Sequence, residues 1–207
     1  MSHSPLQVIL VGPPGAGKGT QAARLAQRFG LVHISPGQIL RDEAASDSPA
    51  GRRTRDLMAQ GQLVPDELVD QLVRERLEAL TPGQGFILDG YPRTAGEAHT
   101  LRDTLARLHR LRRRPLVVWL QAPDDVLRER LRDRAREQHR PDDADEAVTR
   151  RLKAYCETAP ELRQALAGWT HVILVDADKP PDRITEEIVA ALGQAAARKL
   201  RASAASS

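Results

Sequence analysis

The sequence predicts an α/β fold, in which a five-stranded parallel sheet carries helices on both faces. Short, nearly all-apolar runs alternate with longer helical patterns, as buried parallel strands and their crossover helices do. The predicted strands are Gln7–Val11, Leu31–Ile34, Gly85–Leu88, Leu116–Gln121 and His171–Val175. The chain has 207 residues, 41% hydrophobic and 29% charged, so we expect one domain with a sizeable core.

The composition excludes several classes of protein. No apolar run reaches the roughly 18 residues of a membrane span, and Met1–Gln7 lacks the features of a signal peptide. The single Cys156, which is expected to pack in a helix, excludes an internal disulfide and a cysteine-based zinc site. Aromatic residues make up only 3% of the chain, which disfavours a base-stacking surface for nucleic acid. We therefore expect a cytoplasmic protein without a membrane or nucleic-acid partner.

A glycine-rich turn follows the first predicted strand. Gly12, Gly17 and Lys18 fit the pattern G-x-x-x-x-G-K-[ST], but Gly19 comes next and the hydroxyl follows at Thr20. Backbone N–H groups, the lysine charge and the N-terminus of the next helix together suit a phosphate. The alternative is a glycine-rich turn without a ligand, which leaves the register of strand, lysine and helix unexplained.

Two segments interrupt the alternation of strands and helices. About fifty residues with three helical patterns separate the second and third strands, longer than one crossover helix needs. In this segment Ser35–Gln38 predicts a capping box, with proline at the first helical position, and Pro65–Glu67 predicts a second helix start. The other interruption, Ala135–Asp145, is polar and is predicted to be loop-like. Both segments are interpreted as excursions toward a ligand.

A carboxylate ends the third predicted strand. Asp89 would be costly at the end of a buried strand without a function, although a helix-capping role is the alternative. Arg93 follows four residues later, and arginines recur between Arg128 and Arg151. Arginine stays charged and binds phosphate with two parallel hydrogen bonds. The pattern indicates a site for phosphorylated ligands.

These motifs, in this order, resemble those of the adenylate kinases and related nucleoside monophosphate kinases. The matching segments are Gly12–Thr20 (G-x-P-G-x-G-K-G-T), His33–Arg41 (H-I-S-T-G-D-L-L-R), Gly61–Glu67 (G-x-L-V-P-D-E), Gly85–Thr94 (G-F-I-L-D-G-[FY]-P-R-T), the arginines 130, 134, 140 and 151, and Val175–Pro180. The resemblance implies a P-loop NTPase-type sheet within a single kinase domain, residues 1–207. It also implies a helical monophosphate-binding insert at 35–64 and a short lid at 134–144.

The resemblance implies reversible phosphoryl transfer from Mg·ATP to a nucleoside monophosphate, by a monomer. The catalytic residues it implies are Lys18, Asp89, Arg93, Arg134, Arg140 and Arg151. The implied ATP-binding residues are Gly15, Ala16, Gly17, Lys18, Gly19, Thr20, Arg130, Arg134 and Lys179. The implied monophosphate-binding residues are Ser35, Pro36, Arg41, Met58, Gln62, Val64, Gly90, Arg93, Glu97, Arg140 and Arg151. Magnesium is expected to lie near Asp89 through water, without direct protein ligands. The short lid lacks cysteines, so zinc is not expected.

Some positions keep two interpretations. The lid arginines are either phosphate ligands or solvated arginines of a helix face, since Arg128, Arg132 and Arg136 offer other registers. Asp142 and Asp143 are either N-caps or partners that orient those arginines. Thr20 either completes the phosphate loop or begins the helix.

Three departures from the family pattern fall in the acceptor half. Pro36 replaces a threonine, Gln38 an aspartate, and Glu97 a glutamine that reads the base. An ionised carboxylate accepts hydrogen bonds but does not donate them, so Glu97 would suit the N–H groups of guanine better than adenine N1. Alternatively, Glu97 points to solvent. We expect AMP as the acceptor, with GMP or another monophosphate as the alternative.

Two other classes of protein remain possible from the sequence. A P-loop ATPase switch has no acceptor site and leaves Arg41 and Arg93 unexplained. A non-catalytic nucleotide- or RNA-binding protein would use the arginine-rich helices, but it has no need of Lys18, Asp89 and Arg93 together.

Overall fold

The computed structural model describes residues 5–45, 52, 55–56, 65–112, 114–138 and 144–204. Five strands form one sheet in the order β2-β3-β1-β4-β5, and every pair of neighbours is parallel. The strands are β1 (Gln7–Val11), β2 (Val32–Ile34), β3 (Phe86–Asp89), β4 (Leu116–Gln121) and β5 (His171–Asp176). The predicted five-stranded parallel sheet is confirmed, and each strand lies within one residue of its predicted bounds.

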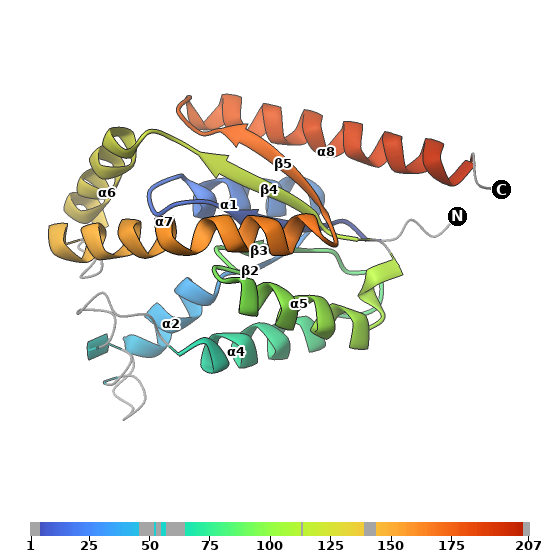
Figure 1. The fold of residues 1–207 in the computed structure, drawn as a ribbon, viewed down its shortest axis with the longest axis horizontal. Coiled ribbons are helices and arrows are strands. Elements are labelled where there is room, and N and C mark those ends of the chain that lie inside the picture. Colours follow the sequence, from blue (N-terminus) through green and yellow to red (C-terminus); the bar gives the residue numbers. More distant parts are fainter. Residues whose placement is uncertain are drawn as a thin grey trace.

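Helices connect the strands and cover the sheet on both sides (Figure 1). They are α1 (Lys18–Phe29), α2 (Pro36–Ala44), α4 (Asp66–Glu78), α5 (Ala95–Arg107), the 3-10 helix η1 (Arg110–Arg112), α6 (Asp124–Gln138), α7 (Asp145–Ala167) and α8 (Pro181–Ala204). Among the described helices, none is both long and apolar enough to cross a membrane.

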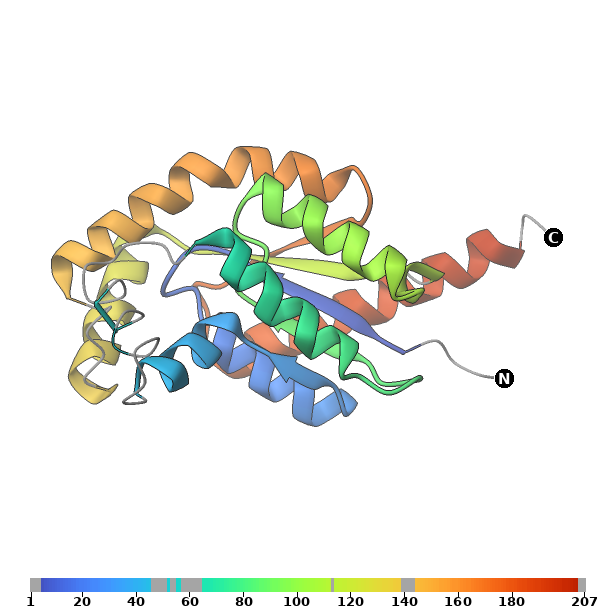
Figure 2. The same ribbon diagram turned by 90° about the horizontal axis from the view of Figure 1, so that it is seen from below.

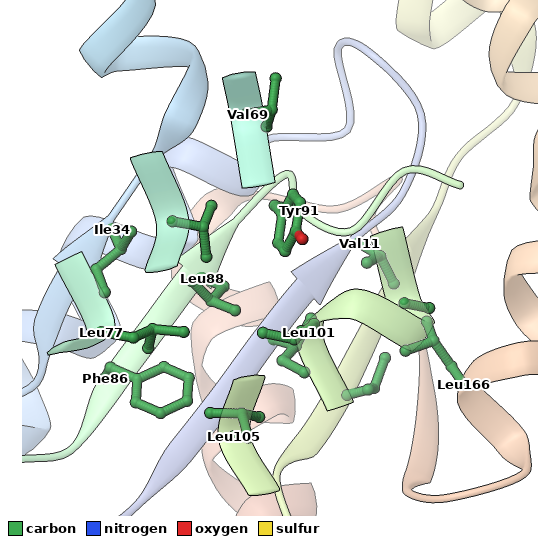
Figure 3. Close-up of a cluster of buried hydrophobic side chains, with 14 of the residues drawn as sticks. Val11, Ile34, Val69, Leu77, Phe86, Leu88, Tyr91, Leu101, Leu105 and Leu166 are labelled. Carbon is green, nitrogen blue, oxygen red and sulfur yellow. The ribbon is translucent and has the colours of Figure 1, made fainter. Parts of the chain in front are cut away.

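The alternating side chains of the strands divide the interior into two apolar clusters. On β1, Ile9 and Val11 face the cluster built with α4, α5 and the C-terminal half of α7. Val8 and Leu10 face the other cluster, built with α1, α6, α8 and the start of α7. Figure 2 shows α5 and α7 on one side of the sheet and α1 on the other. Figure 3 shows the first cluster, in which the buried Tyr91 ring lies among aliphatic side chains.

The strand order places the site. β1 is flanked by β3 and β4. The chain first adds β2 and β3 on one side of β1 and then adds β4 and β5 on the other side. In such open sheets, ligands bind at the carboxyl ends of the strands where the order reverses. Here that edge carries the glycine-rich loop after β1 and Asp89 at the end of β3.

The glycine-rich loop runs close against β4. Gly12 has φ +145°, and a Cβ built there would lie 2.5 Å from the carbonyl oxygen of Leu120. Only glycine fits this position, because any side chain would push the loop off the end of the sheet.

The two predicted excursions are described in part. In the first, α2 and α4 form two of the three predicted helical patterns, while 46–51, 53–54 and 57–64 lie outside the described residues. In the second, residues 135–138 belong to α6 and Asp145 begins α7, so the loop prediction was wrong at both ends. The helical pattern of α6 continues into this stretch, which has no proline or glycine to stop it before Pro141.

Candidate active site

A cavity of about 650 Å³ opens at the carboxyl ends of β1 and β3. Its walls come from the glycine-rich loop, α1, α2, the 89–94 loop, α6, α7 and the start of α8. The predicted site residues that line it are Gly15, Ala16, Gly17, Lys18, Gly19, Thr20, Ser35, Arg41, Asp89, Gly90, Arg93, Arg130, Arg134, Arg151 and Lys179. The cavity therefore brings together residues that are up to 164 positions apart.

Lys18 begins α1 and turns back onto its own loop. Its Nζ donates to the carbonyl oxygens of Gly12 at 2.8 Å and Pro13 at 2.7 Å. Burial lowers the pKa of Lys18 to about 7; Asp89 opposes the shift, and Arg93, Arg151 and Arg134 add to it. The cavity is thus strongly electropositive, as a site for polyphosphate must be.

Asp89 stands opposite Lys18 at the end of β3. Burial disfavours its ionised form, but the hydrogen-bonded His33 and the charge of Lys18 outweigh burial and hold its pKa below the usual value. The His33 Nε2 to Asp89 Oδ2 distance is 3.3 Å. Asp89 is therefore an ionised carboxylate at the rim of a phosphate site.

Three cationic side chains, those of Lys18, Arg41 and Arg93, pass close to two glycines that leave room for them. A Cβ at Gly37 would lie 3.4 Å from Nη1 of Arg41 and 3.6 Å from Nη2 of Arg93. A Cβ at Gly90 would lie 3.5 Å from Cε of Lys18 and 3.9 Å from Nη2 of Arg93. Arg93 is therefore a cation placed between Lys18 and Arg41, and its Nε donates to Gly90 O at 2.8 Å.

The opposite wall of the cavity carries further cations. Arg134 lies on α6 and Arg151 on α7, and both line the cavity beside Lys18. Because these arginines lower the pKa of Lys18 through space, their charges face the same volume. Arg140 lies outside the described residues, as do Met58, Gln62 and Val64.

A third group of residues holds the segment between β5 and α8. Arg130 Nη1 donates to Ala177 O at 2.8 Å, and Lys179 pairs with Glu187 at 2.8 Å and Asp176 at 3.5 Å. Gln21, which is 1% exposed, donates to Pro181 O at 2.9 Å. Sequence reasoning missed Gln21, because its partner is 160 residues away and nothing local predicts the contact.

Glu97 occupies neither of its two predicted positions. It is 3% exposed, so the solvent-facing alternative is wrong, and it does not line the cavity. Its carboxylate accepts from the backbone N–H groups of Arg93 and Thr94, and its own N–H donates to Thr94 Oγ1 at 3.1 Å. This is the reciprocal capping box of α5.

The capping box predicted at Ser35 is wrong. Ser35 is the N-cap of α2, and proline occupies the first turn as expected, but the serine side chain makes no capping bond. Gln38 instead donates to Asp42 at 2.7 Å and accepts from Arg41 at 2.9 Å. Pro36 is buried and does not line the cavity.

The fold and the cavity define a class of protein. A glycine-rich loop with its lysine binds a donor polyphosphate, and a second arginine group across the cavity suits a phosphate-bearing acceptor. These are the parts of a P-loop phosphotransferase whose acceptor group is itself a phosphate.

Comparison with known proteins identifies the family. The family model described as "Adenylate kinase" matches residues 10–164, so the chain belongs to the adenylate kinase family. It is 39% identical over 189 residues to an adenylate kinase of Xylella fastidiosa (strain 9a5c), covering 91% of this chain and 100% of that protein. It is 41% identical over 197 residues to one of Xanthomonas campestris pv. campestris (strain 8004), with the same coverage. An adenylate kinase of Stenotrophomonas maltophilia (strain R551-3) is 38% identical over 189 residues, covering 90% of this chain and 99% of that protein.

Proposed function

We propose that this nucleoside monophosphate kinase transfers the γ-phosphoryl group of ATP reversibly to AMP. The observation that supports this most directly is the convergence of Lys18, Arg93 and Arg41, which come from three separate elements, on one part of the cavity. Lys18 belongs to the glycine-rich loop that binds the donor, and Arg41 and Arg93 lie outside that loop. A P-loop ATPase that transfers phosphate to water has no need of these two arginines.

The proposed chemistry is positioning and charge neutralisation. An oxygen of the acceptor phosphate is the nucleophile, so no covalent enzyme intermediate forms. Arg41 and Arg93 hold the acceptor phosphate. Lys18 stays in contact with the phosphoryl group while that group is transferred. Arg134, Arg140 and Arg151 neutralise charge as the transition state develops.

Magnesium fits the residues present. Asp89 is an ionised carboxylate within the cavity, and Thr20 supplies a hydroxyl that also lines the cavity. Among the described residues, no group of three or more His, Cys, Asp or Glu side chains could hold a metal ion. Mg²⁺ commonly keeps its waters and binds through one or two carboxylates plus phosphates, which matches this sparse set. The ion would screen the phosphate oxygens and steady their geometry, with Asp89 bound through water.

The structure favours AMP over GMP as the proposed acceptor. The guanine alternative requires a free Glu97 carboxylate facing the base. That carboxylate is engaged by the N–H groups of Arg93 and Thr94. Glu97 also does not line the cavity, so it is not placed to accept from the N–H groups of guanine.

We further propose residues 35–64 as the acceptor-binding insert and residues 134–144 as the lid. Arg41 on α2 and Arg134 on α6 carry charge to the cavity from these two segments. Binding of both nucleotides would draw the segments together and exclude water from the transferring group. A monomeric state and a cytoplasmic location stay predictions.

A coupled assay tests this function. Purified protein is incubated with Mg·ATP and with AMP, GMP, CMP, UMP or dAMP in parallel, and ADP formation is followed. We expect AMP to be preferred and ATP hydrolysis without acceptor to be negligible. Lys18→Ala should lower turnover about a hundredfold or more while leaving the fold intact, because it removes one charge that follows the transferring group. Arg102→Ala, on the exposed face of α5, is the control. ATP hydrolysis that no monophosphate stimulates would contradict the proposal.

A further inference from the structure

Glu97 is a buried carboxylate attached to the backbone of Arg93. Its Oε2 accepts from the Arg93 N–H and, at 3.4 Å, from the Thr94 N–H. The side chain is on the first turn of α5, directly behind the loop that enters the cavity. Arg93 is thereby held at two points, since its Nε also donates to Gly90 O. Rotation of its guanidinium away from the cavity would break the hydrogen bond from Nε to Gly90 O.

The same loop is attached to α4. The hydroxyl of Tyr91 donates to Asp70, and Thr94 Oγ1 lies 3.4 Å from Asp66 Oδ2. Asp66 and Asp70 stand on the first turns of α4. Tyr91 is 1% exposed, and its ring is packed in the core beside Val69 of the same helix (Figure 3). The Tyr91 ring of this attachment is therefore buried, while the contact between Thr94 and Asp66 is exposed.

The charges in this cluster are unbalanced. Glu97 faces Asp66 and Asp70 from α4, with Arg93 as the opposing cation. Burial raises the pKa of Glu97 to about 7, while the contacts with Arg93 oppose that shift and the two aspartates add to it. Burying a carboxylate beside two others lowers stability, so its hydrogen bonds to the Arg93 loop must offset that cost.

We propose that Glu97 is a positioning residue that holds Arg93 toward the acceptor phosphate and, together with Asp66 and Asp70, fixes the Arg93 loop to α4. α4 follows the acceptor-binding insert in the chain, so a shift of its first turns is passed directly to Arg93. The proposal rests on the proposed role of Arg93 in binding the acceptor phosphate. It assigns Glu97 no contact with the acceptor base.

Steady-state kinetics with Glu97→Ala and Glu97→Gln test the proposal. Glu97→Ala should raise the KM for AMP about tenfold, since a misplaced binding group loses the equivalent of one good hydrogen bond or more. The KM for ATP should stay within about twofold, because the donor residues lie elsewhere. Glu97→Gln should recover most of the loss, since its amide oxygen accepts the same two bonds. The ratio of AMP to GMP efficiency should be the same in Glu97→Gln as in the parent.

Two further variants keep the test decisive if Glu97→Ala folds poorly. Tyr91→Phe keeps the ring and removes only the hydroxyl, and should raise the KM for AMP about threefold with the KM for ATP unchanged. Asp103→Asn removes an exposed carboxylate from the same helix as Glu97 and should change neither constant.

The outcomes separate this inference from the proposed function. An unchanged KM for AMP in both Glu97→Ala and Tyr91→Phe overturns the inference. A shift of more than about fivefold in the AMP to GMP ratio of Glu97→Gln also overturns it, because that result makes Glu97 a reader of the base. If Arg93→Ala itself leaves the KM for AMP unchanged, the proposed role of Arg93 fails.

Discussion

Among the helices whose N-termini reach the cavity, α2 and α5 have first turns that are built differently. α2 begins after Ser35 with Gln38 at the third helical position, and α5 begins after Thr94 with Glu97 at the same position. Both segments have the residue types of a capping box, yet only α5 forms one.

The difference follows from burial. Gln38 is exposed and has charged neighbours one turn away, so it bonds to Arg41 and Asp42. Glu97 is enclosed, and the backbone N–H groups of Arg93 and Thr94 are the donors within its reach. A capping motif therefore predicts a helix start well, and it predicts the capping bonds only where rival partners are absent.

The largest effect expected from this comparison is on the acceptor arginines. Arg93→Ala should lower kcat/KM for AMP about 100- to 1000-fold, whereas Arg41→Ala should lower it about tenfold. Arg93 is held by Gly90 O and by the Glu97 capping box, while Arg41 extends from α2 and contacts the exposed Gln38. Coupled kinetics at varied AMP measures both variants. Equal losses would mean that the rigid attachment of Arg93 has no consequence for catalysis.

The next effect concerns stability and pH. Because folding raises the pKa of Glu97 from 4.5 to about 7, its contribution to stability is complete below pH 4.5 and is lost as pH rises through 7. Glu97→Gln lacks this loss, so its free energy of unfolding relative to the parent should rise by up to about 3 kcal/mol between pH 5 and pH 8. Denaturant unfolding at both pH values measures the difference. Gln38→Glu, at the exposed equivalent position, should show little change between pH 6 and pH 8, and a pH-independent difference for Glu97→Gln would contradict the argument.

The smallest effect is on the caps themselves. Thr94→Ala should lower the free energy of unfolding by about 1 kcal/mol, because it removes a formed cap. Ser35→Ala removes no capping bond, although it removes the hydrogen bond of the hydroxyl to the Asp89 carboxylate, so its cost should be no larger than that of Thr94→Ala. Thermal or urea unfolding of the two variants distinguishes these values, and a larger loss for Ser35→Ala would reverse the comparison.

The sequence predicted the fold and most of the described cavity because those features depend on local patterns. The strands are short apolar runs, Lys18 stands between two glycines, Asp89 ends a strand, and Arg93 follows that strand by four residues, all of which the sequence shows directly. The position of Glu97 was missed, because its burial depends on α4 packing against α5. Gln21 was missed because its partners Pro181 and Thr185 come from the other end of the chain.

The position of Lys18 has a consequence for the heat of nucleotide binding. Its amine is already held by Gly12 O and Pro13 O, and its pKa is about 7, so near neutral pH a substantial fraction of molecules carries it uncharged. Phosphate groups arriving beside it favour the charged form, so binding should draw a proton from the buffer. Titration calorimetry at pH 7.5 in buffers of different ionisation enthalpy should therefore give apparent binding enthalpies that differ with the buffer. Lys18→Met should remove much of that dependence.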